Sequence, residues 1–432
     1  MRRNAVVTRR MEKSPEIVLV SGVHCTGKER KMQFTFFWKG FVYCAPMDTT
    51  ALENIRSEFP HIREGLIYLN HAATSPLSAR VLRAMQRHLD RRSIGPIDSY
   101  EDDMKTVNAL RSTVQRLINA PSPDRIAFSM NTSDALNIMA SGLSWKSGDR
   151  ILLNDMEFPA NVYPYLNLRR FGVEVDTIAC NDGQLTPERI EQAMTPRTRV
   201  VAVSAVQFLS GFRADLEAIG SLCRSKGALL IVDGIQAVGA ARIDVQKMNI
   251  DGLACGAQKW LMSPHGTGFV FVTERLQHMI QQQYLGWLSL DVPWNFRDYG
   301  QPLAPSARRY EGGTLNFPGL MGMNGALEFM EEIGWETIEK RVAALVDSLI
   351  ASLERIDGCT IESPRDRRHR AGIVTIRCAP ADKAKHVFAR LMASHVVISL
   401  REGLLRISPH FYNSENEVDT FVGKLRDEMK RG

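Results

Sequence analysis

The stretch LIVDGIQA at residues 230–237 decides the fold, together with GAQKWL at residues 256–261. In the first stretch, a run of apolar residues ends in a single acid, Asp233, and then in glycine. Such a run is typical of a buried strand in a parallel sheet, and ligands bind at the carboxyl ends of these strands. A buried carboxylate needs a partner, because otherwise it takes up a proton. Asp233 is therefore either a ligand-binding acid or a residue that caps a helix or forms a turn.

Lys259 follows Asp233 by 26 residues, directly after a second apolar run that we expect to be a strand. The glycine-containing segment SPHGTGF follows at residues 263–269. A lysine in the ligand crevice of a sheet is desolvated, which lowers its pKa and makes its amine a nucleophile toward an aldehyde. The alternative is an ordinary lysine exposed to solvent, which is the common situation for this residue type.

Short apolar runs alternate with amphipathic stretches from Leu66 onward. We expect strands at 126–129, 151–154, 173–179, 200–204, 229–233, 252–255 and 268–272, with helices at 161–170, 187–194 and 215–226. This alternation predicts a parallel sheet with helical crossovers. Near Gly319 the pattern changes to helices at 323–333 and 335–353, and then to strands near 373–377, 396–400 and 404–408. We therefore predict an α/β fold, with a large domain at 47–316 and a smaller α+β domain at 317–432.

Residues 1–46 form a basic extension that we predict to lie outside the fold. They hold nine Lys/Arg and three acids, which accounts for the whole net charge of +6. The rest of the chain holds 45 basic and 45 acidic side chains, so no nucleic-acid partner is expected. A transit peptide and an over-extended translation start are both open interpretations. The segment GVHCTGKE at residues 22–29 approaches a phosphate-binding loop, but Glu29 replaces the required hydroxyl, so we interpret the match as coincidence.

Composition and cysteine spacing exclude several classes of protein. The chain is 44% hydrophobic and 24% charged, as in ordinary soluble proteins, and no apolar run reaches the roughly 18 residues of a membrane helix. The seven cysteines are scattered and form no CxxC pair. Neither a disulfide framework nor a metal site is therefore expected, and a cytoplasmic location with no membrane role fits best.

Two polar segments complete the candidate site. NTSDALN at residues 131–137 follows an expected strand, with Thr132 and Ser133 near the start of an expected helix. Their hydroxyls and the exposed N–H groups would bind a phosphate monoester, or the hydroxyls would simply cap the helix. EGGTLN at residues 311–316 is expected to be a flexible polar loop at the domain junction.

Taken together, these segments resemble the class V aminotransferase family, from about Ile67 to the C-terminus. That family has fold type I of the pyridoxal-phosphate (PLP) transferases and includes cysteine desulfurases, isopenicillin N epimerase and kynureninase. The segments around Asp233 and Lys259 are the most specific part of the resemblance. It implies PLP as the cofactor, an amino acid as the substrate and a homodimer with a shared active site.

The resemblance also implies a role for each matching residue. Lys259 would carry PLP as a Schiff base and later move the proton at the substrate α-carbon. Asp233 would pair with the pyridine nitrogen, and Gln236 would hydrogen-bond the ring oxygen. The other matches are Thr132 and Ser133 for the phosphate, Phe158 against the cofactor ring, Thr314 for a phosphate across the dimer interface, Asn70 and His71 near the substrate, and Arg406 for the substrate α-carboxylate.

Two departures from the family bear on the reaction. Phe158 stands where desulfurases and many relatives stack a histidine on the ring, an arrangement that resembles kynureninases; a plain core residue is the alternative. Desulfurases also carry a nucleophilic cysteine on a loop shortly before the carboxylate-binding arginine. Here the segment SLREGLLR at residues 399–406 is short and contains no cysteine, and we interpret Cys378, in an expected strand, as structural.

We therefore expect a PLP enzyme that acts at the α-carbon of an amino acid by transamination or epimerisation. A C–S lyase or desulfurase-like enzyme is the first alternative, and a hydrolase resembling kynureninase is a second. A PLP-binding protein that has lost catalysis is a more distant one.

Overall fold

The structure is a computed structural model that describes residues 18–19, 36–37 and 48–431. The chain separates into two units, Met1–Thr49 and Thr50–Gly432. In the first unit, the described strands β1 (Val18–Leu19) and β2 (Phe36–Phe37) pair antiparallel. The segment that approaches a phosphate-binding loop, residues 22–29, lies outside the described residues, and the placement of residues 1–46 outside the fold stays a prediction.

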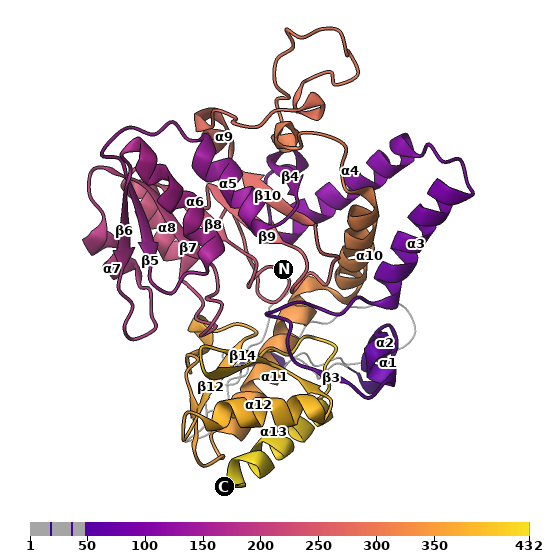
Figure 1. Cartoon of the computed structure of the whole chain (residues 1–432), viewed down its shortest axis with the longest axis vertical. Helices are drawn as coiled ribbons and strands as arrows, with labels where there is room; N and C mark the ends of the chain where they lie inside the picture. The colour runs from indigo at the N-terminus through magenta and orange to yellow at the C-terminus, as the bar shows by residue number, and fades with distance from the viewer. Residues whose placement is uncertain (1–17, 20–35, 38–47, 432) are drawn as a thin grey trace, which may run out of the picture. The chain divides into compact units, whose positions relative to one another are not determined.

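A seven-stranded sheet forms the centre of the second unit (Figure 1), in the order β4-β10-β9-β8-β7-β5-β6. Its strands are β4 (Ile126–Ser129), β5 (Arg150–Asn154), β6 (Glu174–Ile178), β7 (Thr198–Ser204), β8 (Leu229–Asp233), β9 (Gly252–Gly256) and β10 (Gly268–Val272). Strand β10 runs antiparallel to both of its neighbours, and the other neighbouring strands pair in parallel. The predicted α/β fold with a mainly parallel sheet is confirmed.

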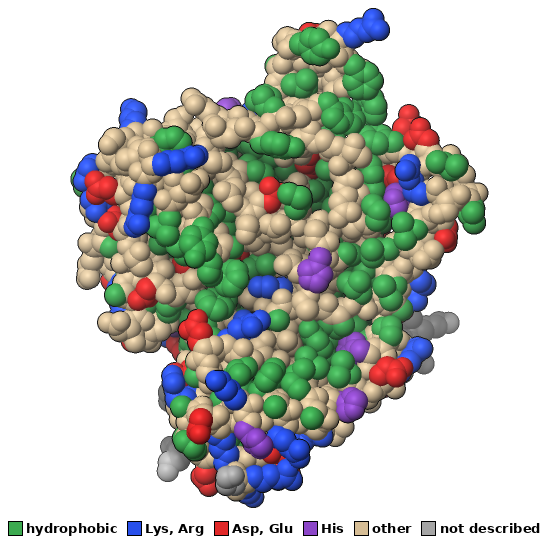
Figure 2. All heavy atoms as spheres, in the orientation of Figure 1, with side chains coloured by type: hydrophobic (Ala, Val, Ile, Leu, Met, Phe, Trp, Pro, Cys, Tyr) green, Lys and Arg blue, Asp and Glu red, His purple; other side chains and the backbone are tan. Residues whose placement is uncertain are grey.

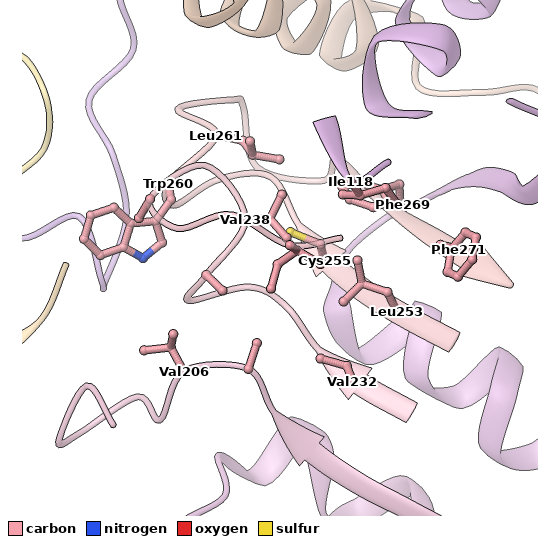
Figure 3. Packing of buried hydrophobic residues seen from close by; sticks show 14 of the residues in the cluster. Ile118, Val206, Val232, Val238, Leu253, Cys255, Trp260, Leu261, Phe269 and Phe271 are labelled. Atoms are coloured by element: carbon pink, nitrogen blue, oxygen red, sulfur yellow. The ribbon is translucent and has the colours of Figure 1, made fainter. Parts of the chain in front are cut away.

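Hydrophobic cores lie on both faces of this sheet, because successive side chains of a strand point to opposite faces. In β7, Val200 and Ala202 belong to one core, whereas Val201 and Val203 belong to the other. Figure 3 shows part of the latter core, where Val232, Leu253 and Phe269 pack together. Both faces are buried, so each central strand reads as an almost continuous apolar run.

Ten α-helices occur in the described chain before α11 (Trp335–Leu353). They are α1 (Thr49–Ser57), α2 (Pro60–Arg63), α3 (Ala79–Ser93), α4 (Tyr100–Leu117), α5 (Thr132–Gly142), α6 (Tyr163–Leu166), α7 (Pro187–Ala193), α8 (Leu216–Ser225), α9 (Glu274–Met279) and α10 (Phe317–Ile333). None of the helices in the described part of the chain combines the length and the apolar character needed to cross a bilayer.

Two of the predicted helices differ clearly from the sequence-based expectation. The stretch predicted as one helix at 161–170 is divided into a 3-10 turn at Pro159–Asn161, the short helix α6 and a 3-10 turn at Asn167–Phe171, since Pro159 and Pro164 cannot donate backbone hydrogen bonds. Helix α10 begins at Phe317, six residues before the predicted start. Its glycines allow close packing: a Cβ on Gly322 would lie 2.7 Å from Cγ of Pro264.

The C-terminal region contains a second, four-stranded antiparallel sheet in the order β11-β12-β15-β14. Its strands are β11 (Cys359–Ile361), β12 (Val374–Cys378), β14 (Ser399–Arg401) and β15 (Leu404–Ile407), and its helices are α11 (Trp335–Leu353), α12 (Lys383–Ala393) and α13 (Glu415–Lys430). Strand β13 (Val396–Val397) pairs in parallel with β3 (Ile67–Tyr68) from near the start of the unit. The smaller α+β region is therefore present.

The predicted domain boundary at residues 316 and 317 stays a prediction. The change from one hydrophobic core to the next occurs inside α11, where Val342 belongs to a core of the large sheet and Leu345 to the C-terminal core. Helix α11 thus joins the two layers (Figure 1).

Candidate active site

Asp233 and Lys259 come from neighbouring strands of the large sheet. Asp233 is the last residue of β8, and Lys259 follows the end of β9 by three residues. Because the two strands are parallel, their carboxyl ends meet at the same edge of the sheet. A cavity of about 660 Å³ lies there. Seven of the ten predicted site residues line it, namely Thr132, Ser133, Phe158, Asp233, Gln236, Lys259 and Arg406.

Burial shifts the pKa values of the acid and the amine in opposite directions. Desolvation raises the pKa of Asp233 to about 7, although a hydrogen bond from the Ile235 N–H to Oδ1, 3.0 Å long, favours the carboxylate. Desolvation lowers the pKa of Lys259 to about 8, against the attraction of Asp233. Near neutral pH the lysine is therefore partly present as the free amine, which is its nucleophilic form. A cationic partner would favour the ionised form of Asp233.

The N-terminus of α5 offers an anion-binding cradle. Asn131 is the N-cap and accepts a hydrogen bond from the Asp134 N–H, so Thr132 and Ser133 are the first residues of the helix and do not cap it. The Thr132 hydroxyl accepts a 2.9 Å hydrogen bond from the Gly256 N–H. A Cβ on Gly256 would lie 2.7 Å from Oε1 of Gln258 and 3.1 Å from Oγ1 of Thr132, so only glycine leaves this space open.

Phe158 is a cavity residue and not part of the core, since 43% of it is exposed. The Lys259 amine lies over its ring, 5.7 Å from the centroid, and the ring of Phe208 meets it edge-on at 5.3 Å. A flat ring beside the reactive amine is suited to pack against the face of a planar cofactor.

The carboxylate of Glu157, the residue before Phe158, holds this segment in place through hydrogen bonds. Its buried carboxylate accepts hydrogen bonds from the side chains of Asn154, Asn161 and Gln207, at 2.7, 2.9 and 2.9 Å. The backbone N–H and the hydroxyl of Ser204 donate to it as well. This network ties the backbone before Phe158 to the end of β7.

The amide of Gln236 is held in one orientation by the protein. Its Nε2 donates to the carbonyl of Ala72 at 3.0 Å, and its Oε1 accepts from Nε1 of Trp260 at 2.9 Å. The second Nε2 hydrogen makes no hydrogen bond to the described residues, so it is available to a ligand in the cavity. The role predicted for Gln236 toward a ring oxygen stays a prediction.

Arg406 lines the cavity from β15. It is buried, and desolvation lowers its pKa to about 10, with a smaller contribution from Arg401. Its Nη1 donates to the carbonyl of Phe208 at 2.6 Å, whereas its Nε has no hydrogen-bond partner among the described residues. A buried donor without a partner is costly, and a carboxylate is its natural ligand.

Three predicted residues lie outside this cavity. His71 is fully buried, with Nδ1 2.9 Å from the carbonyl of Ser408 and Nε2 2.9 Å from the hydroxyl of Tyr412. Asn70 accepts a 2.6 Å hydrogen bond from the hydroxyl of Ser399. Thr314 lines a separate cavity of about 490 Å³. The structure does not bring these three side chains to Lys259.

Sequence reasoning missed other residues of the cavity, above all Gln258, Phe208 and Arg401. Gln258 directly precedes Lys259, so its position beside the lysine was a usable signal. Arg401 lies on the same hairpin as Arg406, but only the strand register shows that both side chains share one face.

The described cysteines do not line the cavity, although the buried Cys255 is close enough to interact electrostatically with Asp233 and Lys259. Burial raises the pKa of Cys180, Cys223, Cys255, Cys359 and Cys378. Cys378 ends β12 and is buried, which agrees with a structural role. Cys25 and Cys44 lie outside the described residues.

Comparisons with known proteins agree with this geometry. A family model described as Aminotransferase class-V matches residues 67–421. A probable cysteine desulfurase of Methanothermobacter thermautotrophicus is 30% identical over 399 residues, which cover 87% of this chain and 98% of that protein. The uncharacterized aminotransferase YcbU of Bacillus subtilis is 28% identical, over 86% of this chain and 97% of its own length.

Solved structures show the same fold. A cysteine desulfurase from Thermococcus onnurineus superposes with a TM-score of 0.80 at 25% identity, over 88% of this chain and 98% of that one. A complex of the cystine C-S lyase C-DES with cysteine persulfide has a TM-score of 0.78 at 22% identity, over 85% of this chain and 99% of that one.

The residues of the cavity fit PLP. The cradle at Gly256 suits its phosphate, and a protonated pyridine nitrogen would pair with the buried Asp233, which forms no ion pair with the described residues. The amine of Lys259 suits its aldehyde, and the unpartnered Nε of Arg406 suits the carboxylate of an amino acid. The chain therefore belongs to the class V aminotransferase family, with PLP-transferase fold type I, and is a PLP-dependent enzyme.

Proposed function

We propose that this enzyme breaks the Cα–H bond of an amino-acid substrate and completes a transamination or an epimerisation. The observation that carries the proposal is the convergence of the Lys259 amine, the Asp233 carboxylate and the Arg406 guanidinium on one cavity. When bound, PLP supplies an electron sink for the bond broken at Cα. The residues of the chain provide the rest of the chemistry.

Each of these residues has a defined task. Lys259 is the base that takes the α-proton and later returns it, a task suited to an amine with a pKa of about 8. Asp233, fully buried, holds a proton on the cofactor nitrogen. Arg406 orients the α-carboxylate through its unpartnered Nε, and Phe158 covers one face of the cofactor and excludes water.

A C–S lyase is the second candidate, favoured by the similarity to a probable cysteine desulfurase at 30% identity. A desulfurase that stores sulfur on its own cysteine needs a mobile thiolate at the substrate. The described cysteines are buried or partly buried and do not line the cavity, and the hairpin before Arg406 carries no cysteine. The cavity supports an elimination that begins with cleavage of the Cα–H bond and stores no sulfur on the protein.

One experiment distinguishes these reactions. The PLP-loaded enzyme is incubated in D₂O with a panel of amino acids, and deuterium at Cα is measured together with the oxo acid, the enantiomer and sulfide. We expect deuterium incorporation with at least one amino acid, abolished in Lys259→Ala and unchanged in Lys430→Ala, an exposed lysine on α13. An oxo acid or an enantiomer would identify the reaction, whereas sulfide release would favour the lyase. No incorporation and no product from any amino acid would overturn the proposal.

We also propose a cytosolic homodimer, in which Thr314 serves the active site of the second subunit. Thr314 lies in the cavity of about 490 Å³ beside Tyr284, which is 74% exposed. Large hydrophobic side chains gather on the adjoining loop, which projects at the top of Figure 2 and includes the exposed Trp294 and Phe296. Patches of this kind are typical of protein interfaces. Light scattering during size exclusion tests the dimer, and a monomer would contradict it.

A further inference from the structure

The hairpin of β14 and β15 carries two arginines on one face. Ser399 pairs with Arg406 and Arg401 pairs with Leu404, so these four side chains point to the same side of the hairpin. Arg401 and Arg406 are diagonal neighbours, whose α-carbons typically lie about 7–8 Å apart in antiparallel sheets. Both side chains line the cavity that contains Lys259.

The turn of this hairpin fixes the orientation of both arginines. Glu402 and Gly403 have φ values of 49° and 79°, the pair of positive values that a two-residue hairpin turn requires. A turn this short leaves no slack between the strands, and a one-residue slip would point every side chain to the other face. Arg401 is therefore held at the mouth of the cavity by the backbone.

The side chain of Arg401 is unpaired within the described part of the chain. No hydrogen bond or ion pair joins its guanidinium to any of the residues at 48–431, in contrast to Arg377 on β12, which binds Glu362 at 2.7 Å. Its charge acts on the cavity, because it contributes to the lowered pKa values of both Lys259 and Arg406.

The lining cations of the cavity do not all have an assigned partner. Lys259, Arg401 and Arg406 line the cavity together with one acid, Asp233. Under the proposed function, Lys259 and Asp233 serve the cofactor, the cradle at α5 takes its phosphate and Arg406 takes the α-carboxylate of the substrate, so Arg401 remains without an assigned ligand. A guanidinium binds a planar oxyanion through two parallel hydrogen bonds.

We propose that Arg401 binds a second anionic group of the substrate, so that the preferred substrate is an amino acid with an acidic side chain. This inference rests on the proposed function, since it assigns Arg406 to the α-carboxylate. A carboxylate and a sulfinate present the same oxyanion chemistry to Arg401. A neutral side chain of the same length leaves this arginine without a partner.

Calorimetry on the PLP-loaded enzyme tests the two-arginine site without any turnover. Succinate and glutarate are the dianionic probes, and butyrate is the monoanionic control. We expect at least one dicarboxylate to bind about tenfold more tightly than butyrate, the worth of one charge-assisted contact. Arg401→Gln should remove that advantage and leave butyrate unchanged, and Arg401→Lys should keep part of it. Arg426→Gln, an exposed arginine on α13, should change neither affinity.

Two outcomes would overturn the inference. One is equal binding of the dicarboxylates and butyrate. The other is an Arg401→Gln variant that weakens all three anions alike, which would make Arg401 a general attractor of anions. Either result leaves the proposed function intact, because deuterium exchange at Cα tests that separately.

The same comparison is then made with substrates. L-aspartate, L-glutamate and L-cysteine sulfinate are compared with L-asparagine and L-glutamine by the concentration dependence of deuterium exchange. We expect the apparent KM of one acidic amino acid to be about tenfold lower than that of its neutral counterpart. Arg401→Gln should equalise the two KM values with little change in the maximal rate. A neutral amino acid preferred by the unaltered enzyme would contradict the inference.

Discussion

The two walls of the cavity are built on different principles. The wall formed by β8 and β9 presents Asp233 and Lys259 from strands that are buried on both faces, and both side chains have strongly shifted pKa values. The wall formed by β14 and β15 is a short hairpin at the edge of a small antiparallel sheet, which presents Arg406 buried and Arg401 exposed. Under the proposed function, the first wall would serve the cofactor and the second the substrate.

We infer that the wall of β8 and β9 sets the reactivity of the site, whereas the wall of β14 and β15 sets its substrate specificity. Desolvation in the large sheet sets the reactivity of Lys259 and Asp233, and moving either residue would disturb two hydrophobic cores. The turn of the hairpin is exposed, so substitutions there cost less stability than substitutions in the large sheet. The hairpin is also where the sequence departs from desulfurases, by its short turn and the absence of a cysteine.

The largest effect is expected at the sheet wall. Lys259→Ala should lower turnover on the order of 10³-fold or more, because the residue is both the attachment point of PLP and the base at Cα. Borohydride should fix PLP covalently to the unaltered enzyme at Lys259 and not to the variant, as measured by peptide mass spectrometry. Substantial turnover by the variant would assign the proton transfer to another base.

Arg406→Gln tests the hairpin wall and should have the next largest effect. Loss of the guanidinium removes a charge-assisted contact to the α-carboxylate, so kcat/KM should fall about 100-fold, or roughly 3 kcal/mol. The visible absorbance of the PLP-loaded protein should stay unchanged, since Arg406 is not assigned to the cofactor. A variant that loses PLP along with activity would show that the two walls are not separate in function.

The pH dependence of PLP uptake tests whether burial lowers the pKa of Lys259 in the wall formed by β8 and β9. Only the unprotonated amine attacks an aldehyde, and a pKa of about 8 leaves roughly one tenth of Lys259 unprotonated at pH 7. The rate at which the apoenzyme takes up PLP should therefore rise about tenfold per pH unit below pH 8 and level off above it. Absorbance after rapid mixing measures this rate. A rise that continues beyond pH 9 would show that burial does not lower the pKa of this lysine.

Phe158→Leu should give the smallest effect. It removes an aromatic contact beside the Lys259 amine but keeps an apolar side chain, so PLP affinity should fall about fivefold, or roughly 1 kcal/mol. Equilibrium dialysis measures it. Phe171→Leu, at a phenylalanine that is 52% exposed, is the matched control and should leave PLP affinity unaltered. Equal losses of PLP affinity in the two variants would contradict a specific role of Phe158 in cofactor binding.

Much of the sheet could be predicted, because each buried strand appears in the local sequence as a short apolar run. The strands at Ile126–Ser129, Leu229–Asp233 and Gly268–Val272 have the predicted bounds, and α11 matches its prediction as well. Helix α10 was predicted too short, since glycines that weaken an isolated helix here permit close packing against a neighbour. Helices α3 and α4 were not predicted.

The site was predicted best where a residue directly follows a strand. Asp233 and Lys259 line the cavity as expected, because the end of a parallel strand fixes where the next side chain lies. A place for His71 near the substrate stays a prediction, and its imidazole is held by Ser408 and Tyr412, which are more than 300 residues away in sequence. Local patterns carry no information about such distant partners.

The family and the cofactor could be identified from the sequence, and the residues that serve the cofactor could be predicted from it, because these depend on short motifs whose spacing is set by one strand and the next. How the wall that carries the two arginines is built became visible in the tertiary structure alone. It brought Arg401 beside Arg406 through the register of a hairpin and placed both across from Lys259. Register and burial are properties of strands that meet in space, so the second arginine and its missing partner could not be read from the order of residues alone.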